Sequence, residues 1–180
     1  MKLRDVLLPV HELMRQHGIR YAVIGGYAVA AWGEVRATRD VDLLCSAGDL
    51  DKLKLALSRA GLDYEHRAGD ADDPISHVVR IRAGTPNAPY EVDFLAGIRG
   101  APAGLFDRSR LISLDGLEVP VASPEDTIVL KMLGGSARDL DDARSIIRTQ
   151  EGRLDSGLLR QLCPDFLAHT CEVLLTSESA

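Results

Sequence analysis

The most informative part of the sequence is residues 21–45, which read YAVIGGYAVAAWGEVRATRDVDLLC. The apolar run from Tyr21 to Ile24 predicts a short buried strand, and the pair Gly25-Gly26 ends it with a turn. A segment of small residues then predicts a short helix, which Trp32 anchors in the core. A second strand is expected over residues 40–45.

Two aspartates stand at the entrance of this second strand. Asp40 and Asp42 are two positions apart, so their side chains point to one face of the strand with Cα atoms ~6.6 Å apart. Carboxylates held this close repel each other and gain nothing from burial. A cation is therefore expected between them, and a divalent metal is the simplest candidate.

A third carboxylate comes from residues 90–95, YEVDFL, which alternate apolar and acidic side chains as a half-buried strand does. If this strand lies beside residues 40–45, Asp93 completes a cluster with Asp40 and Asp42. Magnesium takes oxygen ligands and keeps several waters, so such a cluster and substrate phosphates suit it. Two such ions ~3.5–4 Å apart catalyse phosphoryl and nucleotidyl transfer. The alternative is that the acids are solvated strand ends.

These motifs resemble the nucleotidyltransferase superfamily of the polymerase-beta type. That resemblance rests on Gly25-Gly26, the spaced residues Arg36, Thr38, Asp40 and Asp42, and the pair Val92-Asp93. A second group of residues is similar to the AbiEii-type branch, the nucleotidyltransferase toxins of bacterial toxin–antitoxin systems. This group consists of Ser123-Pro124-Glu125-Asp126, Lys131, Arg138-Asp139-Leu140 and Asp142. Together the resemblance covers about residues 1–150.

The resemblance implies an enzyme that moves a nucleoside monophosphate from an NTP to an acceptor hydroxyl and releases pyrophosphate. Asp40, Asp42 and Asp93 are then the catalytic residues and the ligands of Mg²⁺ or Mn²⁺. The residues implied at the triphosphate are Gly25, Gly26, Arg39 and Lys131, with Asp142 supporting the lysine. The acceptor is an RNA such as tRNA, a protein or a small molecule, and a cognate antitoxin is a further partner. The alternative is a non-catalytic nucleotide-binding or antitoxin-like module, against which the three clustered acids argue.

Several of these residues have simpler interpretations. Lys131 lies in an otherwise apolar segment, so it either directs its ammonium at phosphate or extends along the helix surface into solvent. Asp139 and Asp142 serve the site or only a helix N-terminus. Arg80 and Arg82 share one strand face and line a substrate groove or a solvated edge.

Composition sets the class of protein. A chain of 180 residues with 46% hydrophobic residues predicts one α/β (α+β) domain. We expect a minimal nucleotidyltransferase core over residues 1–121, with a small mixed sheet flanked by helices, and a helical region over residues 122–180 packed on it. The net charge of −6 argues against broad nucleic-acid affinity. No apolar run is long enough to span a membrane. Three irregularly spaced cysteines favour a reducing cytoplasm over a disulfide framework.

Turn and capping signals place the remaining elements. Helices are expected over residues 3–17 and 49–60. Two hairpins are expected, one joining residues 76–82 to 90–95 and one joining 112–114 to 117–121 through Asp115-Gly116. Residues 67–74 are expected to form a polar loop. A helix is expected from Ser123, with a break at Gly134-Gly135 and a fresh helix after it.

Overall fold

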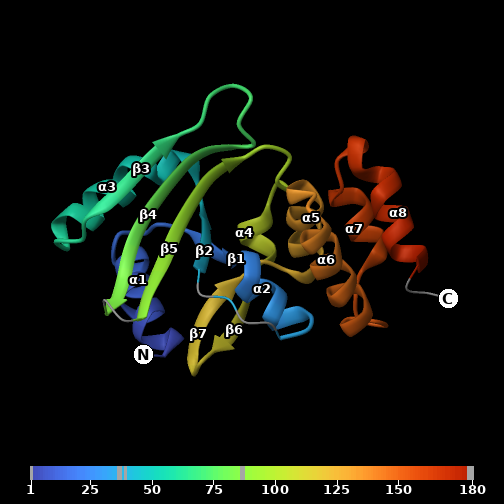
Figure 1. Ribbon diagram of the computed structural model, residues 1–180, viewed down its shortest axis with the longest axis horizontal. Helices are drawn as coiled ribbons and strands as arrows, with labels where there is room; N and C mark the ends of the chain where they lie inside the picture. Colours follow the sequence, from blue (N-terminus) through green and yellow to red (C-terminus); the bar gives the residue numbers. More distant parts are fainter. Residues whose placement is uncertain (1, 36–37, 39, 86–87, 178–180) are drawn as a thin grey trace.

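The computed structural model describes residues 2–35, 38, 40–85 and 88–177 (Figure 1). In these residues seven strands form one mixed sheet in the order β3-β4-β5-β2-β1-β7-β6. The strands are β1 Tyr21–Ile24, β2 Asp40–Cys45, β3 Tyr64–Ala68, β4 Ile75–Thr85, β5 Ala88–Ile98, β6 Arg110–Leu114 and β7 Leu117–Val121. The α-helices are α1 Leu3–Gln16, α2 Gly25–Trp32, α3 Leu50–Arg59, α4 Leu105–Arg108, α5 Pro124–Gly134, α6 Ala137–Thr149, α7 Ser156–Leu162 and α8 Ala168–Ser177. Two short 3-10 helices, η1 Ala47–Asp49 and η2 Asp165–Leu167, precede α3 and α8. The predicted α/β fold with a C-terminal helical segment is confirmed.

Both predicted hairpins are present. Strands β4 and β5 pair antiparallel, and so do β6 and β7. The turn between β6 and β7 has positive φ at Asp115 (50°) and Gly116 (76°), as a two-residue hairpin turn of the primed type requires. Strand β2 then joins β5 in parallel and β1 antiparallel, which makes it the centre of the sheet.

The sheet has two different faces. On one face Val41 and Leu43 of β2 and Val92 and Phe94 of β5 are fully buried, in one core cluster with apolar residues of α1 and α3. The alternate residues of these strands point to the other face, which carries the acids. There Ile24 and Leu44 belong to a smaller cluster with residues of α4 and α5. The first face supplies the main core, and the second leaves room for a site.

The helices after β7 begin as the sequence predicts. The Ser123 side chain accepts a hydrogen bond from the Asp126 backbone, and Pro124 occupies the first position of α5. Gly135 ends α5 with a left-handed φ of 67°, and Ser136 with Asp139 forms the capping box of α6. Figure 1 shows α7 and α8 at the end of the molecule farthest from α3.

Trp32 anchors α2 as expected. Its indole is buried, and Nε1 donates a hydrogen bond of 2.7 Å to the Ala122 carbonyl. No helix in the described part of the chain is long and apolar enough to cross a membrane.

Two elements differ from the sequence expectations. The loop expected over residues 67–74 starts only after Ala68, because Tyr64–Ala68 pairs with β4 as the edge strand β3. Most of its side chains are exposed, so backbone pairing rather than an alternating pattern defines this strand. The helix α4 has four residues, too few for a periodic signal.

The buried ion pair between α4 and α5 gives a first prediction. Asp126 is fully buried and receives two hydrogen bonds from Arg108, of 2.7 and 3.0 Å. We expect Arg108→Met to lower the free energy of unfolding by about 3 kcal/mol, because the carboxylate loses its counter-charge. Urea unfolding measures this change.

The matched control is Arg20→Met. Arg20 pairs with Asp107 at 3.0 Å, but the two side chains are 68% and 74% exposed. Such a pair contributes about 0–1 kcal/mol. Equal losses in the two variants would contradict the importance of the Arg108–Asp126 pair.

Candidate active site

The register of two parallel strands brings the predicted acids to one face. Asp42 of β2 lies opposite Asp93 of β5, and Asp40 lies opposite Glu91. The two strands are neighbours in the sheet, which is the condition on which the predicted cluster depends. In the described residues, however, no three His, Cys, Asp or Glu side chains converge closely enough to hold a metal ion.

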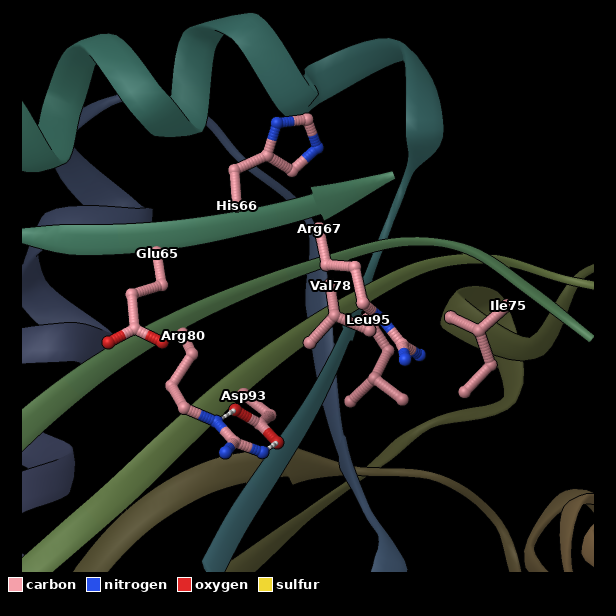
Figure 2. A pocket seen from close by; sticks show the side chains of 8 residues that line it. All are labelled: Glu65, His66, Arg67, Ile75, Val78, Arg80, Asp93 and Leu95. Atoms are coloured by element: carbon pink, nitrogen blue, oxygen red, sulfur yellow. Dashed lines mark hydrogen bonds and ion pairs between the residues drawn. The ribbon is translucent and has the colours of Figure 1, made fainter. Parts of the chain in front are cut away.

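Asp93 is engaged by an arginine. Arg80 of β4 donates from Nε to Oδ1 at 2.7 Å and from Nη2 to Oδ2 at 2.6 Å (Figure 2). Its Nη1 also lies 3.1 Å from Glu91. Arg80 faces Asp93 directly across the β4–β5 hairpin. Arg80 was expected at a substrate groove or a solvated edge, and its pairing with Asp93 was not predicted, although the hairpin register sets the two residues opposite each other.

Asp42 has a different environment. Its side chain makes no hydrogen bond or ion pair in the described part of the chain. Burial raises the pKa of its carboxyl to about 6, and the negative charges of Asp93 and Asp40 add to this rise, while Lys131 and Arg80 oppose it. A half-buried carboxylate without a partner, beside other acids, is the donor chemistry that a divalent cation suits. The donor chemistry of these acids therefore suits a metal ion, although the described residues do not gather into a three-ligand cluster.

Gly25 allows this approach to Asp42. It is the first residue of α2 and has a left-handed φ of 61°. A Cβ at this position would lie 2.0 Å from Oδ2 of Asp42, so a side chain is excluded. Gly26 packs against Thr38, where a Cβ would lie 3.0 Å from the threonine side chain. Arg36 and Arg39 lie outside the described residues.

Lys131 lies across a cleft from the sheet. The cleft, of about 290 Å³, is lined by Gly25, Asp42, Lys131 and Asp139 and by apolar residues including Ile75 and Leu95. The Lys131 ammonium lies 2.8 Å from Asp139 and 2.9 Å from Asp142. Its side chain is 13% exposed, so the alternative of a lysine that extends into solvent is wrong. The predicted Lys131 and Asp142 thus form one ion-pair network with Asp139.

Sequence comparison identifies the family. A model of the nucleotidyl transferase AbiEii toxin of type IV toxin–antitoxin systems matches residues 13–178. This chain belongs to the AbiEii family. As a member of this family it is a nucleotidyltransferase. No curated protein matches the sequence.

Solved structures share the fold of this AbiEii protein. The solution structure of the antibiotic-resistance factor ANT(2'')-Ia has a TM-score of 0.61 and 14% identity, with 100% of both chains covered. Its crystal structure with adenylyl-2''-tobramycin has a TM-score of 0.56 and 16% identity, covering 97% of this chain and 95% of that one. An antigenic nucleotidyltransferase-like protein from Paracoccidioides brasiliensis has a TM-score of 0.56 and 19% identity, covering 97% and 92%. At such identities the likeness establishes a common fold.

The contact between Gly25 and Asp42 gives a second prediction. Gly25→Ala places a Cβ in the left-handed region and against the carboxylate. The backbone strain costs about 1–2 kcal/mol, and displacement of Asp42 adds to it. Gly61→Ala is the control, because Gly61 has a φ of 68° with no atom within 4 Å. Urea unfolding should show the larger loss for Gly25→Ala, and equal losses would refute the steric contact.

The raised pKa of Asp42 gives a third prediction. The folded protein holds this proton up to a pH of about 6, whereas the unfolded chain loses it near the ordinary value of 3.8. The stability contributed by the proton is therefore lost as pH rises through this window. Asp42→Asn has no proton to lose, so its stability relative to the parent should rise by about 2 kcal/mol between pH 4 and 7. Urea unfolding in a chelating buffer tests this, and a pH-independent difference would contradict it.

Proposed function

We propose that this AbiEii protein moves a nucleoside monophosphate from an NTP to an acceptor hydroxyl, with Mg²⁺ or Mn²⁺ held by Asp40, Asp42 and Asp93. The observation that carries the proposal is the register of β2 and β5, which sets Asp42 opposite Asp93 beside Gly25. The bound metal supplies charge neutralisation of the triphosphate and lowers the pKa of the acceptor hydroxyl.

The cleft supplies the nucleotide subsite in this proposal. Gly25 and Gly26 form the first turn of α2, where backbone N–H groups lack intrahelical partners and suit phosphate oxygens. Lys131 adds a positive charge on the opposite wall, and Asp142 with Asp139 fixes the position of its ammonium. The apolar residues of the cleft offer a surface for the nucleoside. Arg39 is proposed as a further triphosphate ligand, on the sequence motif alone.

The remaining parts of the proposal concern location and organisation. The family is defined by toxins of type IV toxin–antitoxin systems, which supports a cognate antitoxin as a partner. The free thiols of Cys45, Cys163 and Cys171 support a cytoplasmic location. We also propose a division into a core over residues 1–121 and a helical region over residues 122–180. The glycine pair and the strand acids come from the first part, and Lys131 with its two acids comes from the second.

A labelling experiment tests the function. The protein is incubated with each NTP labelled at the α-phosphate, Mn²⁺, and total cell RNA, cell protein or an aminoglycoside. We expect one acceptor class to gain label with the parent, and Asp42→Asn to reduce the rate about 10²–10³-fold. Asp141→Asn is the control, because Asp141 is an exposed acid of α6 paired with Arg144 at 2.7 Å.

The outcomes separate enzyme from binding module. NTP binding without transfer to any acceptor would favour the non-catalytic alternative. Equal rates for the parent and Asp42→Asn would show that the metal site is assigned wrongly.

A further inference from the structure

A second depression lies beside the cleft on the acid face of the sheet. It is a groove of about 470 Å³, lined by Arg67, Val78, Arg80 and Asp93 among others, from β3, β4 and β5 (Figure 2). Ile75 and Leu95 line both the groove and the cleft, so the two depressions meet at these apolar side chains. Asp42 lines the cleft and Asp93 lines the groove. A transfer between two substrates needs two adjoining subsites, and this pair of depressions provides them.

The groove carries an uncompensated positive charge. Arg67 is exposed, and its side chain makes no hydrogen bond or ion pair in the described part of the chain. Figure 2 shows its guanidinium beside Leu95, on the same side of the sheet as Arg80. Glu65 also lines the groove, and its carboxylate pairs with Arg82 at 3.1 Å. A ligand in the groove therefore meets one free guanidinium and the guanidinium that holds Asp93.

Arg80 also competes for Asp93. Its N–H donors take one lone-pair site on each carboxylate oxygen, at 2.7 and 2.6 Å, so the carboxylate is less available to a metal. A metal on Asp93 would also face the positive charge of Arg80 at short range, which is unfavourable. A metal therefore binds Asp93 more easily if an anion draws Arg80 away from it. The planar fork that fits a carboxylate fits a phosphate equally well.

We propose that the groove is the acceptor subsite, that it takes an acceptor carrying a phosphate group, and that Arg80 exchanges Asp93 for this phosphate. The inference rests on the proposed function and deepens it. Arg67 anchors the anion, and Arg80 moves from the carboxylate to the phosphate while Asp93 becomes free for the metal. Acceptor binding and metal binding then strengthen each other. A polycationic acceptor has no such effect, because two guanidinium groups repel it.

Linkage between the two ligands tests this proposal. Mn²⁺ binding is measured by electron paramagnetic resonance with a non-hydrolysable NTP analogue, without and with the dinucleotide UpU, which carries one phosphodiester. We expect UpU to tighten Mn²⁺ binding at least about fivefold. Arg80→Met should bind Mn²⁺ more tightly than the parent without UpU and lose the response to it. Arg67→Gln should keep the parent's Mn²⁺ affinity without UpU and need more UpU for the response.

Controls make the result specific. Arg144→Met removes an arginine of α6 that is 39% exposed, much like Arg80, and pairs with Asp141 at 2.7 Å, and this variant should behave like the parent. Glucose 6-phosphate tests whether a phosphate monoester serves as well as a phosphodiester. Melting curves of all variants verify that they fold.

Three results would overturn the inference alone. These are Mn²⁺ binding by Arg80→Met no tighter than by the parent, an unchanged UpU response in Arg80→Met, and a stronger response to tobramycin than to UpU. Absence of Mn²⁺ binding in the parent and all variants would instead overturn the proposed function, and the inference with it.

Discussion

The site depends on the repulsion between carboxylates that the parallel register of β2 and β5 sets side by side. Asp42 faces Asp93 across the two strands, with Asp40 and Glu91 as the next pair. Because Val41 and Val92 bury the opposite face, neither strand can rotate to separate the acids without exposing core residues. The energy of the main core thus holds together charges that would otherwise move apart. The positions of the other charged side chains at the site follow from this constraint.

Two cationic side chains offset part of this negative charge, and each forms ion pairs with two acids. Arg80 bridges Glu91 and Asp93, and Lys131 bridges Asp139 and Asp142. Asp42 lies between these two networks and has neither cation as an ion-pair partner. Its raised pKa reflects burial first and the neighbouring acids second. This distribution of charge leaves Asp42, which lines the cleft, without an ion-pair partner.

Local signals predicted much of this arrangement, and tertiary pairing explains the rest. The glycine pair, the hairpin turn at Asp115-Gly116 and the cap at Ser123 are short-range features, so the strands and helices around them followed from the sequence. The edge strand β3 did not, because it depends on pairing with β4 rather than on its own periodicity. The bond from Arg80 to Asp93 needs the hairpin register, and the pairing of Lys131 with Asp139 needs the packing of α5 on α6, whereas its pairing with Asp142 was expected. The residue types at the site could be predicted, but most of the ion pairs between them could not.

In the proposed exchange, Arg80 trades the Asp93 carboxylate for a phosphate. Arg80 is 38% exposed and Asp93 13%, so solvent screens part of their attraction, while the bidentate geometry makes the pair stronger than an ordinary surface pair. Its Nη1 contact with Glu91 does not involve Asp93 and can persist when the carboxylate is released. A ligand shifts such a balance only by its difference in affinity for the two states. An anion that takes both donors of Arg80 replaces two charge-assisted hydrogen bonds with two of the same kind, so the exchange stays close to neutral. Because this exchange of hydrogen bonds is close to neutral, the affinity of the metal for the freed Asp93 determines whether Arg80 stays on the carboxylate or moves to the anion.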